Sequence, residues 1–164
     1  MALTMQNSIY LVIKESDPVI LQVSGRASFD NCAGVRDFFA NRRQEGEKHF
    51  VVDLKLCRGM DSTFLGILAG LANELSELGG SLTLTRPSET LVAVIDNLGL
   101  NRLLKVVPTF VSEETGTPLP TKELSEIEQA RLVLEAHESL VEANPETKPN
   151  FLDVIEFLKE RLKY

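Results

Sequence analysis

Three consecutive residues with polar side chains, Asp61, Ser62 and Thr63, stand where a strand pattern gives way to a helix pattern. The strand pattern is the apolar run from Phe50 to Leu54, and the helix pattern continues to Gly79-Gly80. This order places the Ser62 hydroxyl on the first helical turn, where unpaired N–H groups and the helix dipole favour a negative group. The residues alone leave two interpretations open: a cluster that caps the helix, or a site at which a phosphate is tolerated and visible to a partner.

Small residues accompany Ser62 along the expected helix. At about 100° per residue, one side collects Ser62, Gly66, Ala69, Gly70 and Asn73, and Phe64 points roughly 160° away from Ser62. We call these five residues the Ser62 face. Because its side chains are small, another surface can approach the helix backbone closely. The pattern fits a face that docks a partner, or one against which a neighbouring helix, such as the C-terminal segment, packs.

Composition excludes several classes of function. The chain has 164 residues, 43% of them hydrophobic and 25% charged, and its net charge of −7 disfavours binding to nucleic acid. No apolar run of membrane-spanning length and no leader pattern is present, so we expect a cytoplasmic protein that binds no membrane. Cys32 and Cys57, the only cysteines, are too few for a disulfide framework or a zinc site and are expected to be buried free thiols.

No catalytic constellation emerges from the sequence. His49 is expected to end a strand, His137 to be a solvated helix residue, and neither lies near a plausible nucleophile in the chain. The Gly66-x-x-x-Gly70 spacing falls inside a helix and indicates packing, not a phosphate loop. We therefore expect no enzyme activity, no cofactor and no metal site.

Hydrophobic periodicity predicts an α/β fold with a mixed sheet of about five strands and helices packed on it. A hairpin is followed by alternating helices and strands, a pattern typical of such sheets. Strands are expected over Ser8–Lys14, Val19–Ser24, His49–Leu54, Ser81–Thr85 and Leu103–Val107, and helices over Ser28–Arg43, from Asp61 to Gly79-Gly80, and from Ser88 to Gly99. The expected organisation is a domain over residues 1–111, a linker over 112–120 and a helical extension over 121–164.

The extension carries most of the negative charge, with 6 Lys+Arg against 12 Asp+Glu in residues 111–164. It reads as a helical hairpin, Thr121–Ala143 and Asn150–Lys163. A two-helix unit cannot bury such apolar stripes alone, so we expect the hairpin to dock on the domain or on a dimer mate. Docking on the Ser62 face would make it an autoinhibitory cover. The stripes consist of Leu124, Ile127, Leu134 and Val141 in the first helix and Phe151, Ile155, Leu158 and Leu162 in the second.

From about residue 8 to 110 the chain resembles the STAS domains of bacterial anti-sigma factor antagonists. The family pattern is roughly Asp-Ser-Ser/Thr-Gly-hydrophobic-Gly; here Phe64 replaces the first glycine, and Asp61, Ser62, Thr63, Leu65 and Gly66 match. The other landmarks that fall in order are Gly25 after the second strand, Asp53 ending the third, Gly79-Gly80, and Gly99-Leu100.

The resemblance implies a regulatory protein that binds an anti-sigma factor with serine-kinase activity and so releases a sigma factor. It makes Ser62, with Thr63 as second choice, the phosphorylated residue, and Asp61, Ser62, Thr63, Gly66, Ala69, Gly70 and Asn73 the partner-binding residues. A phosphatase would restore binding, and a homodimer stays open. The principal alternative, favoured by Phe64, is a scaffold subunit that is never phosphorylated; a lone enzyme domain is the weakest.

Overall fold

A computed structural model describes residues 9–109 and 115–163 of the chain. In these residues, six strands form one mixed sheet in the order β5-β4-β3-β2-β1-β6. β1 pairs antiparallel with β2 and β6, and β2 to β5 run parallel to one another. The strands are β1 (Tyr10–Lys14), β2 (Val19–Ala27), β3 (His49–Met60), β4 (Ser81–Thr85), β5 (Lys105–Val107) and β6 (Thr117–Pro118).

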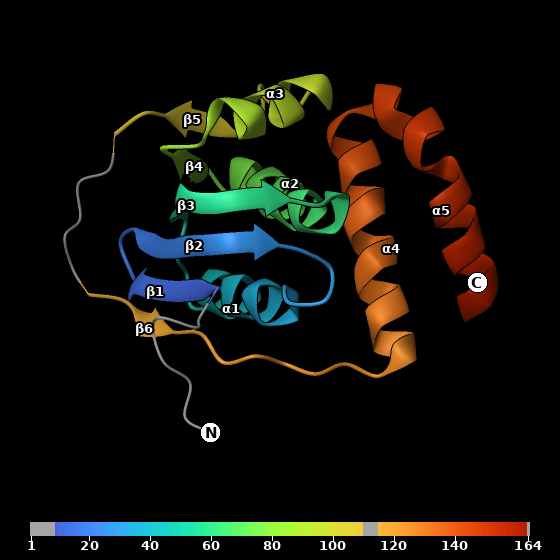
Figure 1. The fold of residues 1–164 in the computed structure, drawn as a ribbon, viewed down its shortest axis with the longest axis horizontal. Coiled ribbons are helices and arrows are strands. Elements are labelled where there is room, and N and C mark those ends of the chain that lie inside the picture. Colours follow the sequence, from blue (N-terminus) through green and yellow to red (C-terminus); the bar gives the residue numbers. More distant parts are fainter. Residues whose placement is uncertain (1–8, 110–114, 164) are drawn as a thin grey trace.

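Helices connect the parallel strands, as parallel pairing requires. α1 and α2 lie behind the sheet in the view of Figure 1, and α3 lies beside β4 and β5. The C-terminal hairpin, α4 and α5, stands at the end of the sheet where β2 and β3 finish (Figure 1). The helices are α1 (Ala33–Gln44), α2 (Ser62–Glu77), α3 (Glu89–Asn97), α4 (Glu126–Ala143) and α5 (Lys148–Leu162), with a 3-10 turn, η2 (Pro145–Thr147), before α5.

The core lies between the sheet and α1 and α2. β3 supplies Phe50, Val52 and Leu54 to it, all at most 1% exposed, and α2 supplies Phe64 at 0%. Phe64 stacks on Tyr10 of β1, with ring centroids 5.9 Å apart. The predicted fold class is therefore confirmed, with its mixed sheet, packed helices and C-terminal helical hairpin, and Phe64, expected to point away from Ser62, lies in the core.

Several element boundaries differ from the sequence prediction. β3 continues to Met60, so Asp53 lies within the strand and does not end it. α1 begins at Ala33 without a side-chain cap, later than the expected start at Ser28. Asn31, before the helix, accepts hydrogen bonds from the Tyr10 hydroxyl and Ser28 N–H. Two residues of the predicted linker form β6, which attaches this segment to the edge of the sheet.

The hairpin is docked on the domain, as predicted, but the predicted stripe of its first helix is only partly right. Ile127 is 59% exposed, and the helix has two buried stripes instead of one. Leu132, Ala136 and Leu140 join the main core. The second stripe packs against α5 in a separate cluster, to which all four predicted apolar residues of α5 belong; the cluster consists of Ala130, Val133, Leu134, Val141, Phe151, Val154, Ile155, Leu158 and Leu162.

Candidate functional site: the Ser62 face

Asp61 fixes the start of α2. Its Oδ1 accepts a hydrogen bond from Phe64 N–H at 2.9 Å, which is the N-cap interaction expected for this residue type. Its Oδ2 accepts from Phe29 N–H at 2.8 Å, in the loop between β2 and α1. One carboxylate thus holds the helix start against a neighbouring loop and places Ser62 at the first helical position.

Ser62 forms a hydrogen bond with His137 of α4, with Oγ and Nε2 separated by 2.8 Å. The other ring nitrogen, Nδ1, lies 2.7 Å from the carbonyl oxygen of Val133. A carbonyl oxygen only accepts, so Nδ1 carries a proton and donates it. In the neutral ring Nε2 is then an acceptor, and the Ser62 hydroxyl donates to it. The ring also packs edge-on against Phe151 of α5, with centroids 5.3 Å apart.

Gly66, Gly70 and Asn73 of the Ser62 face lie against the same helix. A Cβ atom built on Gly66 would overlap the carbonyl oxygen of Ala136 and lie 2.8 Å from the Ala136 Cα. A Cβ on Gly70 would lie 3.0 Å from Ser139 Oγ, and Asn73 Nδ2 donates to Glu142 Oε1 at 3.1 Å. The small side chains of α2 therefore allow α4 to approach its backbone, which is the packing alternative that the sequence left open.

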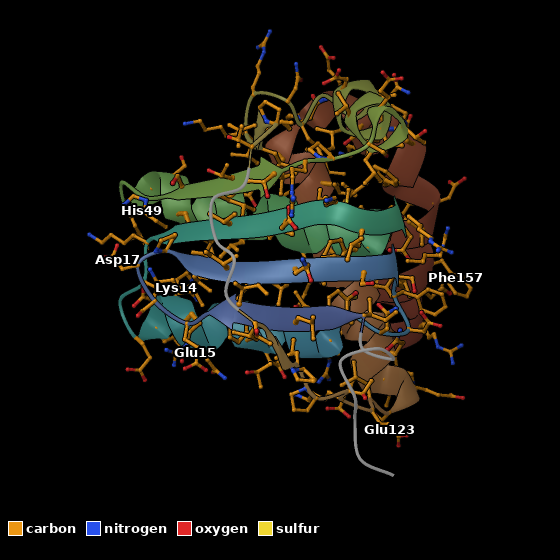
Figure 2. The ribbon with its side chains drawn as sticks, turned by 60° about the vertical axis from the view of Figure 1, so that its left-hand side comes forward. Lys14, Glu15, Asp17, His49, Glu123 and Phe157 are labelled. Carbon is orange, nitrogen blue, oxygen red and sulfur yellow. The ribbon has the colours of Figure 1, made fainter. Side chains whose placement is uncertain are left out.

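Polar contacts hold the two ends of α4 on the domain. Near its start, Gln129 Nε2 donates to the carbonyl oxygen of Phe29 at 2.6 Å. Just after its end, Asn144 Nδ2 donates to the carbonyl oxygen of Leu98, at the end of α3, at 2.9 Å. The view in Figure 2 places Phe157 of α5 at the opposite end of the molecule from Lys14 and His49. The hairpin therefore belongs to the same end of the sheet as the start of α2.

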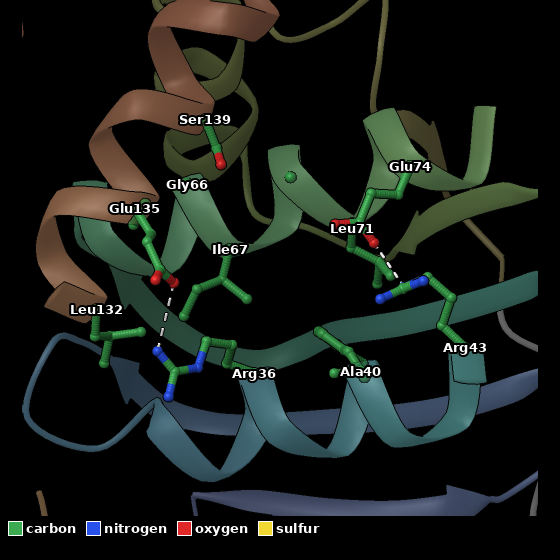
Figure 3. A pocket seen from close by; sticks show the side chains of 13 residues that line it. Arg36, Ala40, Arg43, Gly66, Ile67, Leu71, Glu74, Leu132, Glu135 and Ser139 are labelled. Atoms are coloured by element: carbon green, nitrogen blue, oxygen red, sulfur yellow. Dashed lines mark ion pairs between the residues drawn. The ribbon is translucent and has the colours of Figure 1, made fainter. Parts of the chain in front are cut away.

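A hollow of about 200 Å³ lies alongside this interface, between α1, α2 and α4. Ion pairs flank it in Figure 3, Arg36 to Glu135 at 3.7 Å and Arg43 to Glu74 at 2.6 Å. Its lining includes neither Ser62 nor His137. Ser62 and His137 are placed as a nucleophile and its base would be, but this hollow gives a substrate no place beside them.

The structure places each predicted site residue as follows. Thr63, Gly66 and Ala69 are buried, and Asp61, Ser62, Gly70 and Asn73 are partly exposed. All seven lie on the first three turns of α2 or at its cap, and Thr63, at 3% exposure, is far less accessible than expected of a second phosphoacceptor.

The residue that sequence reasoning missed is His137. It is 5% exposed and bonded to the Ser62 hydroxyl, so the expectation of a solvated histidine far from any nucleophile is wrong. A signal was present in the sequence. Leu132, Ala136 and Leu140 recur at helical spacing, and His137 adjoins that stripe.

A second polar group lies within the sheet. Asp53 is fully buried and accepts hydrogen bonds from Thr85 Oγ1 at 2.8 Å and from Arg86 Nε and Nη2 at 3.0 and 2.8 Å. Burial alone would raise the pKa of Asp53, but the hydrogen bonds from Arg86, Thr85 and Gln22 outweigh burial and lower this pKa below its usual value. This group joins β2, β3 and β4 and is structural.

Residues 9–109 and 115–163 contain no group of three or more His, Cys, Asp or Glu side chains arranged to hold a metal ion. No helix in these ranges is long and apolar enough to cross a membrane. Cys32 and Cys57 are both buried free thiols, as expected, and burial raises the pKa of Cys32 to about 12.

Comparisons with known proteins agree with this architecture. The chain is similar in structure to a putative anti-sigma factor antagonist, TM1081 from Thermotoga maritima, at 21% identity and a TM-score of 0.55, covering 63% of this chain and 87% of that one. It is also similar to the anti-sigma factor antagonist SpoIIAA in its unphosphorylated form, at 17% identity and a TM-score of 0.53, covering 62% and 89% of the two chains. At these identities the likeness shows the fold.

A comparison with curated proteins gives no match. The family model described as "Mlab, STAS domain" matches residues 11–107. This range is more than half of the chain; it includes the Ser62 face and ends before α4. The chain therefore belongs to the STAS-domain family, with a C-terminal helical hairpin outside the family match.

Proposed function

We propose that this protein is a cytoplasmic regulator of the anti-sigma factor antagonist type, which binds an anti-sigma factor with serine-kinase activity through the Ser62 face. In this proposal Ser62 Oγ attacks the γ-phosphorus of ATP held by the partner. The new O–P bond forms as the bond to ADP breaks, and the hydroxyl proton leaves to a base. The phosphoserine ends binding, and a phosphatase restores the hydroxyl by hydrolysis.

The observation that supports the proposal best is the position of Ser62. It is the first residue of α2, directly after a capping aspartate, and it heads a face of small residues. The helix dipole favours a phosphate there by about 0.3–1 kcal/mol, and the adjacent Asp61 carboxylate opposes it by a similar amount. A phosphate on Ser62 should therefore change the stability of the STAS domain little, whereas like charge placed at a docked interface costs several kcal/mol of binding free energy.

Because α4 covers the Ser62 face, binding in this proposal requires α4 to leave. The protein itself would be a substrate and a binding module and would have no catalytic role. The family match and the fold support this reading. The Ser62–His137 contact is compatible with it, because His137 belongs to the C-terminal hairpin, which lies outside the family match.

Intact-mass analysis tests phosphorylation directly. We expect the full chain, incubated with ATP and lysate of the source cell, to gain one phosphoryl group, and the Ser62→Ala variant to gain none. The Thr63→Ala variant is the matched control and should behave like the wild type. Persistent absence of phosphate on the wild type, with the lysate active on its other substrates, would refute the switch.

Affinity measurements test the consequence. The kinase is first purified from the same lysate by following its activity. It should bind the Ser62→Ala variant, and its affinity for the Ser62→Glu variant should be at least about tenfold lower, or ~1.4 kcal/mol. Calorimetry with wild type, Ala and Glu proteins measures this. Equal affinities for the three proteins would show that charge at position 62 does not control binding.

A second candidate function has its own support. The Ser62 face is already filled by α4, and Phe64 replaces the family glycine. Both features suit a scaffold subunit that is never phosphorylated and that assembles through another surface. The intact-mass experiment separates the two, because the scaffold gains no phosphate.

A further inference from the structure

The hydroxyl proton of Ser62, which a phosphoryl group would replace, is directed at His137 of α4. Oγ and Nε2 are at direct hydrogen-bonding distance, 2.8 Å. A phosphoryl group on Oγ adds three oxygens and a charge of about −1.5 to −2 at this point. For the phosphate to be accommodated, either the histidine ring or the helix that carries it has to move.

The ring is held in place within the interface. It donates from Nδ1 to the Val133 carbonyl within its own helix, and Phe151 of α5 packs against it. His137 is 5% exposed. Rotating the ring away would break the Val133 bond inside a packed interface and leave a buried polar group unpaired. The ring is thus held from two sides, and rotating it would not remove the charge that the phosphate places against α4.

The charge of α4 also opposes a phosphate. The helix carries five glutamates and one arginine, Glu126, Glu128, Glu135, Glu138, Glu142 and Arg131. On the α2 side, Asp61 is adjacent to Ser62. Three of these glutamates pair with Arg36, Lys159 and Arg161 of other elements, so a dianion at Ser62 adds like charge mainly to Asp61 and to the remaining excess of acid on α4. Among the described residues, the ring nitrogen of His137 is the one bonded to the Ser62 hydroxyl.

We infer that phosphate on Ser62 and docking of the α4–α5 hairpin exclude each other, so that phosphorylation releases the hairpin from the Ser62 face. The inference rests on the proposed function only in taking Ser62 as the phosphoacceptor. Release uncovers the stripe of Leu132, Ala136 and Leu140, which the docked hairpin buries in the main core. Reciprocally, a docked hairpin protects Ser62 from a kinase.

Hydrogen exchange on the full chain tests the release without any partner. Phosphoserine is installed at position 62 during translation, and Ser62→Glu serves as its mimic. We expect amides of α4 to exchange at least about tenfold faster than in the wild type, with β2 and β3 unchanged. The matched control is Ser76→Glu, which places the same charge on an exposed position of α2.

An engineered disulfide gives an independent reading. An ideal Cβ at Gly70 lies 3.5 Å from the Ser139 Cβ, within the range of disulfides, so Gly70→Cys with Ser139→Cys links α2 to α4. Cys32 and Cys57 are buried and do not compete. In a glutathione buffer, the equilibrium constant for closing this disulfide measures docking. Ser62→Glu in this background should lower the constant at least about tenfold, and Ser76→Glu should not.

The outcomes are distinct. Faster exchange confined to the hairpin, with a weakened disulfide, supports the inference. Unchanged or slower exchange overturns it, the slower case meaning that His137 captures the phosphate as an ion pair. If Ser62→Glu also accelerates exchange in β2 and β3, the glutamate has destabilised the whole domain. Exchange in the shorter Ser62→Asp variant and the disulfide equilibrium then decide whether the hairpin is released. None of these measurements needs a kinase. They can therefore contradict release of the hairpin while the intact-mass experiment supports phosphorylation of Ser62, or support release while that experiment finds no phosphate.

Discussion

Replacing Gly66 by alanine tests directly whether α4 packs on the Ser62 face in solution. The added Cβ would overlap the carbonyl oxygen of Ala136 and lie 2.5 Å from its carbonyl carbon. These are backbone atoms, which cannot rotate away, so α4 itself has to shift. Gly70→Ala makes the same chemical change one turn later, where the nearest atom is the rotatable Ser139 hydroxyl at 3.0 Å.

The two substitutions should change stability in opposite directions. Alanine in place of glycine inside a helix contributes about 1 kcal/mol at either position. At Gly66 the obstacle is backbone, so we take overpacking at the upper end of its usual range, ~2–3 kcal/mol. After the helix gain is subtracted, we expect a net loss of ~1–2 kcal/mol in the free energy of unfolding. At Gly70 the hydroxyl can turn aside, so most of the gain should remain. For a chain of this length, 1 kcal/mol corresponds to a Tm change of about 2–4 °C.

Thermal unfolding by circular dichroism, with hydrogen exchange on α4, measures the effect. Gly66→Ala should lower Tm by about 2–8 °C and expose α4 amides, and Gly70→Ala should leave Tm unchanged or raise it by up to about 4 °C. A Gly66→Ala protein as stable as Gly70→Ala would mean that no backbone lies against Gly66 in solution. The same result would remove the structural basis of the hairpin as a cover.

Three further substitutions test single contacts. Ser62→Ala removes the hydroxyl that donates to His137 and should cost ~1–3 kcal/mol, measured by urea unfolding; no loss would mean that water replaces the contact. Asp61→Ala removes the α2 cap and its bond to Phe29 and should cost ~0.5–2 kcal/mol, with Asp61→Asn losing less. The lowered pKa of Asp53 stabilises the fold above the unfolded value of 3.8, so stability should fall as pH drops below it, and Asp53→Asn should flatten that slope in acid titrations. An unchanged slope would assign the acid sensitivity to other carboxylates.

Local patterns were enough to predict the fold. The apolar run of β3, the cap at Asp61 and the glycines that end α2 and α3 are short-range signals, and each acts within a few residues. The register of β3 beyond Leu54 was not predictable, because its exposed residues Lys55 and Leu56 carry no strand signal. Its extension depends on pairing with β2 as far as Ala27 and Met60, which is a tertiary effect.

Only the α2 side of the candidate site was predictable from the sequence. Helical geometry brought together the small residues of α2 because they lie within one element. The helix that packs on them, α4, comes later in the chain, and Ser62 and His137 are 75 residues apart. No local sequence pattern connects the two helices. The sequence pattern predicted one apolar stripe in α4, but the helix has two, and the stripe that was not predicted is the one that packs on the main core. A helix with two apolar stripes has to bury both, and one of them requires a partner outside the hairpin.

The cost of uncovering the Ser62 face sets how the proposed switch can operate. Leu132 and Leu140 are 0% exposed in the docked hairpin. Burying a leucine contributes ~1.5–3 kcal/mol, so opening costs ~3–6 kcal/mol and leaves roughly one molecule in 10²–10⁴ open. A partner that binds only the open form therefore binds 10²–10⁴-fold more weakly than its affinity for the open face.

Phosphate changes two quantities in this scheme. It raises the open fraction by expelling α4, and it lowers the affinity of the open face by placing like charge at the interface. A STAS domain without a cover experiences only the second effect. In this chain the phosphorylated state would be open and free of the first partner, with the Leu132, Ala136 and Leu140 stripe exposed. The hairpin thus adds a change of conformation to the loss of one interaction, and the two effects can be measured separately because only one of them requires a partner.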